Sequence, residues 1–248
     1  MIEPTLCFNP VIQRRMHFVK YASDGLPIYT DLLQAIADVC KARVKTHHQN
    51  TIGIIGRTSS GKSTLAVNLS YLIDDFFHVK GNYLITKEDL AKKLKKPLDS
   101  VSPVNLFDEG SIILNSANHA TKDSTNLTTL FDIMRSWEMT SLFCVPKLRT
   151  LNNRIRNDHI DLILVCGKAP FRGYDPRAFF LAHIRTESSV FSEAVYWMPF
   201  AWGFSPVSMP THLEAEYLPL KKATQDRYRQ QLVEQYLSDD NDDLMAMV

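Results

Sequence analysis

The sequence predicts an α/β fold built on a mainly parallel sheet that helices cover on both faces, with an antiparallel addition towards the C-terminus. Short apolar runs alternate with amphipathic segments through the middle of the chain, which is typical of parallel strands joined by helices. A glycine-rich turn at residues 56–64 joins one such run to a helix. From residue 168 onward, aromatic and turn residues replace the alternation, and this change favours a strand hairpin.

Local patterns predict the elements in order. Residues 1–29, with Pro4, Pro10 and Pro27, are expected to be irregular, and Asp31 is expected to cap a helix. The patterns then predict a strand at 51–56, a helix from 62, a short strand at 83–85, a Lys-rich helix at 87–96 and a strand at 104–107. Further along they predict a helix at 127–139, a strand at 141–145, a helix at 148–157, a strand at 159–166, antiparallel strands at 178–185 and 194–198, and a helix at 224–237.

Composition sets the domain organisation and excludes some classes of function. The 248 residues suit one large domain with or without a small appendage. We expect an N-terminal extension and helix at 1–49, a core at 50–167 that contains the glycine-rich turn, and a C-terminal part at 168–248 with a hairpin, a helix and an acidic tail packed on the core. With 28 basic and 27 acidic residues, any nucleic-acid contact must come from local patches.

Targeting and redox signals are weak. The cysteines have no C-x-x-C spacing, so neither a zinc site nor a disulfide framework is expected. The N-terminus lacks the pattern of a secretory signal, and the apolar stretch at 190–207 contains a glutamate, two prolines and a glycine, which is too broken for a spanning helix. We therefore expect no transmembrane segment and a cytoplasmic location, in a host cytoplasm or a virion if the chain is viral.

The turn at residues 56–64, GRTSSGKST, matches the phosphate-binding loop G-x-x-x-x-G-K-[ST] between a strand and a helix. Gly56 and Gly61 let the loop's N–H groups face phosphate oxygens, and the first turn of the next helix adds unpaired donors. Lys62 should reach the β- and γ-phosphates, and the Ser63 hydroxyl should bind Mg²⁺. The expected nucleotide-binding residues are Gly56, Arg57, Thr58, Ser59, Ser60, Gly61, Lys62, Ser63 and Thr64.

An acidic pair follows the apolar run at 104–107. A carboxylate at the end of that strand, Asp108, would lie beside the phosphate-binding loop and hold Mg²⁺. The next residue, Glu109, is suitably placed to orient and deprotonate an attacking water, a role that hydrolysis requires and simple nucleotide binding does not. The two motifs together predict ATP hydrolysis, with ATP and Mg²⁺ as cofactors.

With GRTSSGKST and FDEG, the chain resembles the additional-strand catalytic-glutamate P-loop ATPases over roughly residues 50–166. Within them it is most similar to the FtsK-HerA type of DNA-translocating and viral genome-packaging ATPases, with the zonula-occludens-toxin-like phage ATPases close behind. The resemblance implies a P-loop NTPase fold and an oligomeric ring, commonly a hexamer, that moves DNA. It also implies a capsid, portal or membrane-associated partner.

One position departs from that family. Its members usually carry a polar sensor, often Gln, after the strand that follows the acidic one, whereas this chain has Val145-Pro146-Lys147. Either Asn152 or Asn153 substitutes, or the γ-phosphate is sensed differently.

Basic residues complete the set of candidates. An arginine on the γ-phosphate accelerates hydrolysis in such ATPases, and Arg135 is the leading candidate. Phosphates of DNA require basic side chains, and two groups are dense: the lysines of the 87–96 helix, and a second group that forms the predicted nucleic-acid contact. That second group is Lys147, Arg149, Arg154 and Arg156.

Two other functions stay open. The loop motif also begins many P-loop kinases and small-molecule phosphotransferases, although Glu109 beside Asp108 and the lack of an Arg-rich lid favour a motor ATPase. The third hypothesis is a slow nucleotide-dependent assembly factor that acts through its aromatic C-terminal surface.

Overall fold

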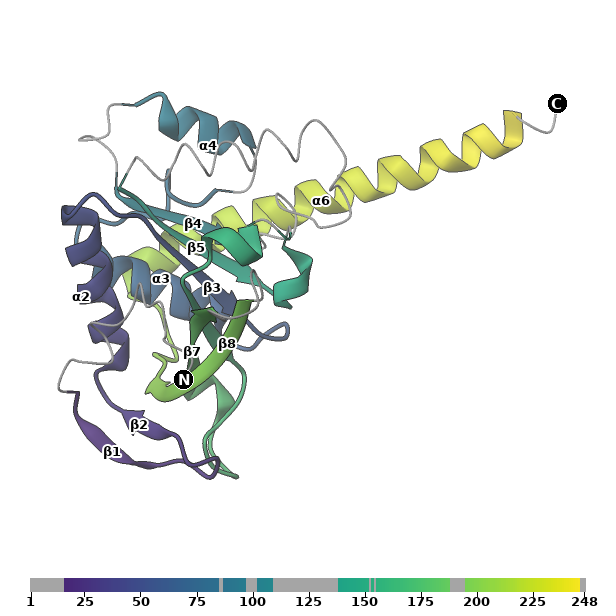
Figure 1. The fold of residues 1–248 in the computed structure, drawn as a ribbon. Helices are drawn as coiled ribbons and strands as arrows, with labels where there is room; N and C mark the ends of the chain where they lie inside the picture. The colour runs from purple at the N-terminus through teal and green to yellow at the C-terminus, as the bar shows by residue number, and fades with distance from the viewer. Residues whose placement is uncertain are drawn as a thin grey trace. The chain divides into compact units, whose positions relative to one another are not determined.

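The computed structural model describes residues 16–84, 87–96, 102–108, 138–151, 153, 155–187 and 195–245. Backbone contacts divide the chain into two units, Met1–Met209 and Pro210–Val248. In the described part of the first unit, eight strands form one mixed sheet (Figure 1). In spatial order they are β1 (Phe18–Tyr21), β2 (Pro27–Tyr29), β8 (Val195–Phe204), β7 (Phe179–Glu187), β6 (Leu162–Cys166), β3 (Asn50–Ile55), β5 (Thr140–Val145) and β4 (Val104–Asp108).

Strand direction follows the prediction. The four neighbours β6, β3, β5 and β4 pair in parallel, whereas β7 pairs antiparallel with both β6 and β8. The mixed α/β fold with an antiparallel addition is therefore confirmed. Strand β8 is longer than expected, since it runs from Val195 to Phe204 across the proline at 199 and stays paired with β7 over that length.

Both faces of the parallel part are covered. Every residue of β4 and β5 is buried, as expected for strands between two layers of helices. On one side α2 (Leu32–Lys45) packs against α3 (Lys62–Ile73), which lies along β3, β4 and β5. A hydrophobic cluster of buried side chains contains Phe107 and Phe143 from the sheet, with Leu90 of α4 (Lys87–Leu94). The phenylalanine rings stack at 4.6 Å.

The N-terminal region corrects one prediction. Residues 16–29 are not irregular, because β1 and β2 extend the sheet beyond β8. Pro27 is the first residue of β2, a position that tolerates its missing N–H, and Ile28 is fully buried in an apolar cluster with Trp202. Asp31 gives α2 no side-chain cap, because its carboxylate accepts a hydrogen bond from the backbone N–H of His17 at 3.0 Å.

The segment after β5 corrects a second prediction. The expected helix at 148–157 is a 3₁₀ turn, η4 (Leu148–Thr150), and a π-helical turn, η5 (Ile155–His159). Leu151 is extended between them, and its buried side chain joins the same cluster as Ile155. Burial of Leu151 thus interrupts the helical pattern. The expected strand at 83–85 is a single bridge from Tyr83 to Leu106.

The second unit is α6 (Thr211–Met245), longer than the expected helix at 224–237. Pro219 lies inside it and interrupts its hydrogen bonding by lacking an N–H. Between Pro219 and the C-terminal end, polar and charged residues predominate. Among the described residues, no helix combines the length and apolar character needed to cross a membrane.

Candidate functional site

Four parallel strands end at one edge of the sheet, and the predicted site lies there. In the pairing register, the last residue of β3, Ile55, lies between Val145 of β5 and Val165 of β6. Asp108, the last residue of β4, pairs with Cys144. Loops that follow these strands must therefore be neighbours, and the carboxyl edge of such a sheet is where ligands bind.

The glycine-rich turn joins β3 to α3, and α3 begins at Lys62 as the pattern predicts. Gly61 precedes the helix with φ of 88° and Ser59 has φ of 62°, so the chain passes twice through the left-handed region that favours glycine. These turns place successive backbone N–H groups at the start of α3, where the helix dipole favours an anion.

Close packing fixes the loop against the end of β6. A Cβ on Gly56 would lie 2.8 Å from the carbonyl oxygen of Cys166, and one on Gly167 would lie 2.8 Å from Cβ of Ser60. Both distances are shorter than van der Waals contact, so the backbone approaches to a distance that only glycine permits. Ser60 is buried here, and its hydroxyl has no hydrogen-bond partner within the described chain.

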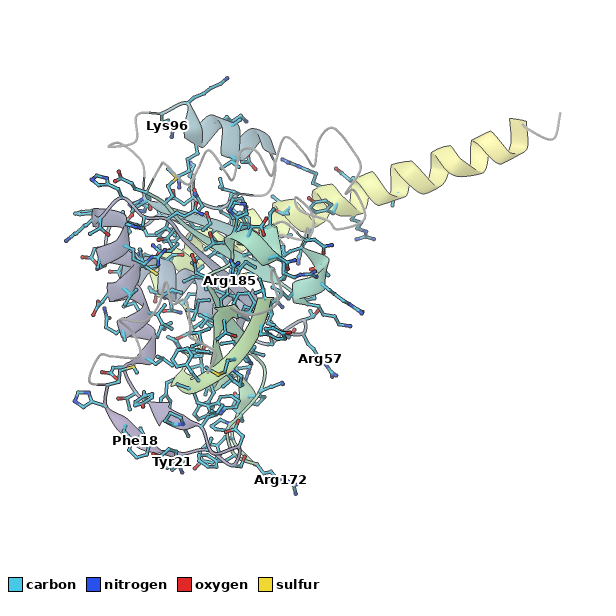
Figure 2. The ribbon with its side chains drawn as sticks, viewed as in Figure 1. Phe18, Tyr21, Arg57, Lys96, Arg172 and Arg185 are labelled. Atoms are coloured by element: carbon cyan, nitrogen blue, oxygen red, sulfur yellow. The ribbon has the colours of Figure 1, made fainter. Side chains whose placement is uncertain are left out.

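Lys62 folds back over the loop. Its Nζ donates a hydrogen bond to the carbonyl oxygen of Arg57 at 2.9 Å. The ammonium is therefore held beside the loop backbone, where the β- and γ-phosphates of a nucleotide would lie. Arg57 projects from the molecule in Figure 2.

Ser63 and Asp108 meet although 45 residues separate them. The Ser63 hydroxyl donates to Oδ1 of Asp108 at 2.9 Å, and the Tyr83 hydroxyl lies 3.5 Å from Oδ2. The Asp108 side chain is only 3% exposed. A hydroxyl and a carboxylate are the oxygen ligands that Mg²⁺ prefers, and Mg²⁺ usually takes few protein ligands because it keeps waters and binds phosphate. The residues present fit that ion.

The cysteines beneath the loop are structural. Burial raises the pKa of the Cys166 thiol to about 12, an effect that the nearby Lys62 partly opposes. Cys144 donates its S–H to the carbonyl oxygen of Lys62 at 3.8 Å. Because nucleophilic cysteines need a lowered pKa, the raised pKa of Cys166 favours a packing role beside the loop.

A segment that the sequence did not single out forms one side of the site. The loop between β6 and β7 returns to the start of α3, where the position of a Cβ on Gly61 lies 3.8 Å from the backbone oxygen of Arg177. Arg177 also forms a salt bridge with Asp175 at 2.9 Å. Hydrogen bonds from the Arg177 side chain and backbone lower the pKa of Asp175. No local motif marks this segment, and only the pairing of β6 with β3 brings it here.

The other predicted residues are distributed unevenly. Lys147 and Arg149 follow β5 at the carboxyl edge of the sheet and are exposed. Arg156 donates to the side-chain oxygens of Asn153 at 2.7 Å and Asn157 at 3.2 Å, so Asn153, one of the two sensor candidates, is engaged with an arginine. Glu109, Arg135, Asn152 and Arg154 lie outside the described residues.

The lysines of α4 do not form one exposed cluster. Lys92, Lys95 and Lys96 are exposed, but Lys93 is buried and donates hydrogen bonds inside the protein. Elsewhere in the described chain, no three His, Cys, Asp or Glu side chains gather as a metal-binding group.

Comparison with known proteins gives a structural similarity but no match by sequence. No protein-family model matches the sequence, and no curated protein matches it. Among solved structures, the chain is similar to the N-terminal domain of zonular occludens toxin from Neisseria meningitidis, with a TM-score of 0.36 and 10% identity. The match covers 68% of this chain and 99% of that one. A similarity of this extent identifies no family, and the chain's own geometry carries the assignment of the site.

Proposed function

We propose that this chain is a Mg²⁺-dependent P-loop ATPase that uses hydrolysis to move DNA, as a translocase or genome-packaging motor in an oligomeric ring. One observation carries the ATPase proposal: the 2.9 Å hydrogen bond between Ser63, in the first turn of α3, and the buried Asp108 at the end of β4. Two sequence motifs that were matched separately thereby meet at one point, as the two metal-binding elements of a P-loop ATPase must.

Each residue then has a task. The loop's N–H groups hold the α- and β-phosphates, and the Lys62 ammonium, which lies 2.9 Å from the Arg57 carbonyl, moves to the β- and γ-phosphates. Ser63 and Asp108 would hold Mg²⁺, which would supply positive charge to neutralise the phosphates during hydrolysis. Glu109, one residue beyond the buried strand, takes the proton of the attacking water.

Nucleotide binding and hydrolysis test the ATPase proposal. Lys62→Ala should reduce ATP affinity and hydrolysis at least tenfold. The matched control Lys92→Ala, at an exposed position on α4, should leave both unchanged. Without Mg²⁺, Asp108→Asn should bind ATP as tightly as the wild type does. It should lose the increase in ATP affinity that Mg²⁺ gives to the wild type. Wild-type hydrolysis in Lys62→Ala would remove the loop from the mechanism.

Glu109→Gln separates binding from chemistry. It should retain ATP and hydrolyse it at least a hundredfold more slowly, since general-base catalysis contributes about 10²- to 10⁴-fold. Single-turnover measurements with radiolabelled ATP give both quantities. A wild-type rate would assign the base to another group.

The DNA-motor part of the proposal is supported by Lys147 and Arg149, which are exposed directly after β5, at the same edge as the loop. A polymer bound there would be adjacent to the site of hydrolysis. Steady-state ATPase with and without double-stranded DNA, together with the mass in solution, tests it. Stimulation by DNA and a ring-sized mass are expected, whereas turnover that requires a small phosphate acceptor would instead indicate a kinase.

A further inference from the structure

A polar pocket lies at the opposite end of β4 from Asp108. It has a volume of about 420 Å³ and is lined by the segment that follows α3, by α4, and by the residues before β4. Val104 begins β4 and Asp108 ends it, so the two sites are separated by roughly 13 Å of extended chain. A volume of this size falls in the range of small-molecule sites, about 300–1,000 Å³.

A buried amine lies in the wall of this pocket. Lys93 is 4% exposed, and its Nζ donates to Oδ1 of Asn82 at 2.8 Å and to the carbonyl oxygen of Val104 at 2.6 Å. A neutral amine has two N–H groups, which these acceptors use. An ammonium has a third, and an anion in the pocket is a suitable acceptor for it.

The charges around Lys93 favour an anion. Lys80 and Lys96 also line the pocket and are exposed, and Lys96 projects from the end of α4 in Figure 2. His78 lines it as well, and Asp74 is the acidic side chain in the lining. Three lysines against one aspartate leave a net positive charge, and concave basic sites of this kind attract phosphate groups.

The rim adds an apolar feature. Phe76 lines the same pocket and is 86% exposed. Since an exposed aromatic ring beside a basic pocket can stack on a flat group, a ligand with a phosphate and a planar ring would use both. We propose that this pocket binds a small phosphorylated molecule with a flat ring, a nucleoside monophosphate being the simplest, through Lys80, Lys93 and Lys96.

Protonation of Lys93 couples this binding to pH. Burial lowers the pKa of Lys93 to about 7, Asp74 partly opposes that effect, and Lys96 adds to it. A bound phosphate favours the ammonium and so raises this pKa, which means that affinity is full below about pH 7 and declines as pH rises above it. Ionisation of the phosphate itself has the opposite effect on affinity, because the ligand gains negative charge as the pH rises.

The test uses the full chain carrying Lys62→Ala, which removes phosphate binding at the glycine-rich loop. Calorimetric titration with AMP should show binding, and adenosine, which lacks the phosphate, should bind at least tenfold more weakly. Lys80→Gln with Lys96→Gln should weaken AMP at least tenfold. The matched pair Lys92→Gln with Lys95→Gln, exposed on the same α4 segment but outside the pocket, should change it less than twofold.

Affinity for AMP should also fall at least fivefold from pH 6.5 to 8.5, and the fall should persist in His78→Gln. Lys93→Met is a second test if the variant folds, and it should lose both the binding and the pH dependence. Absence of AMP binding, equal weakening by the control pair, or a flat pH profile would overturn the proposal. Tighter binding of a single-stranded oligonucleotide than of AMP, with the same lysine dependence, would overturn it in favour of nucleic acid.

Discussion

At the residue scale, absent side chains shape the phosphate-binding loop as much as charged ones do. Gly56 and Gly167 come from different strands, and both let backbone and Ser60 pack at distances that a Cβ would prevent. The loop is therefore held from the β6 side before any ligand binds. Preorganised backbone donors cost less to arrange when the nucleotide arrives.

Gly167→Ala tests this packing. Its φ of 81° costs about 1–2 kcal/mol for a residue with a Cβ, and the added contact with Ser60 should displace the loop and weaken ATP binding at least tenfold. Gly173→Ala is the matched control, because its φ is 84° but nothing lies within 4 Å of its Cβ position. It should lose similar backbone stability and keep ATP affinity. Equal affinities in the two variants would contradict the packing role.

At the element scale, the buried amine of Lys93 attaches α4 to the start of β4, and the hairpin of β7 and β8 attaches the N-terminal strands to the parallel sheet. Neither attachment resembles the ordinary apolar contact between layers. The first is a hydrogen bond from one buried side chain, and the second depends on close contact between Gly203 and the buried ring of Phe180.

Stability should depend on pH through Lys93. Burial lowers its pKa from 10.5 to about 7 in the folded protein, so the cost of burying the ammonium is complete below pH 7. Between pH 7 and 10.5 folding releases a proton, and the free energy of unfolding should rise with pH by up to about 1.4 kcal/mol per unit from this group. Denaturant unfolding at pH 7, 8 and 9 measures this contribution as the difference in free energy of unfolding between wild type and Lys93→Met. A difference that does not change with pH would contradict the lowered pKa.

Gly203→Ala should destabilise the hairpin by about 1–3 kcal/mol, because a Cβ there would overlap the Phe180 ring, which is fully buried and has no room to move. Gly53→Ala in β3 is the control. Its nearest neighbour would be Cδ1 of Ile160 at 3.5 Å, an ordinary contact. Thermal unfolding compares the two, and an equal loss would mean that strand glycines matter here for some reason other than close contact.

At the scale of the whole molecule, the sheet order brings together segments from distant parts of the chain. The loop after β3, the acid Asp108 at the end of β4, the basic residues after β5 and the loop after β6 all lie at one edge. The proposed motor would need its nucleotide site and its polymer contact to be coupled, and common attachment to one sheet edge would be a rigid way to couple them. The described strands of this sheet also include β1 and β2, which lie outside the predicted core at residues 50–167.

DNA binding should therefore depend on salt through Lys147 and Arg149. Neutralising both to Gln should reduce the slope of log affinity against log salt by about 2, since each phosphate contact contributes about 0.9. The control pair Lys45→Gln and Lys222→Gln removes the same charge from other exposed positions. Fluorescence anisotropy with double-stranded DNA at several salt concentrations gives the slopes, and equal slopes for the two pairs would exclude this surface.

An arginine supplied between subunits gives a further prediction. If Arg135 acts on the γ-phosphate of a neighbouring subunit, specific ATPase activity should rise with protein concentration, and Arg135→Ala should remove that rise while ATP still binds. Mixing Arg135→Ala with Glu109→Gln chains should restore part of the activity, because each supplies what the other lacks. Concentration-independent activity in the wild type would rule out a contribution in trans.

The sequence alone determined the glycine-rich turn, its strand and helix, the acidic strand and the antiparallel hairpin, because each depends on local periodicity and on residue types that few other conformations accept. It did not predict β1 and β2, the break at Leu151 or the burial of Lys93. Those depend on which distant groups are present: Trp202 beside Ile28, the apolar cluster around Leu151, and the carbonyl of Val104 beside Lys93.

Asp108 was expected beside the phosphate-binding loop from its motif, but its contact with Ser63 and the approach of Gly61 to Arg177 are seen only in the tertiary structure. Local patterns specify how each segment folds, since backbone and neighbouring side chains act over a few residues. The order of strands in a sheet depends on the summed packing of the whole core, and no local pattern records it. The proposed chemistry was therefore indicated by local motifs, whereas the composition of the candidate site came from the order β6-β3-β5-β4.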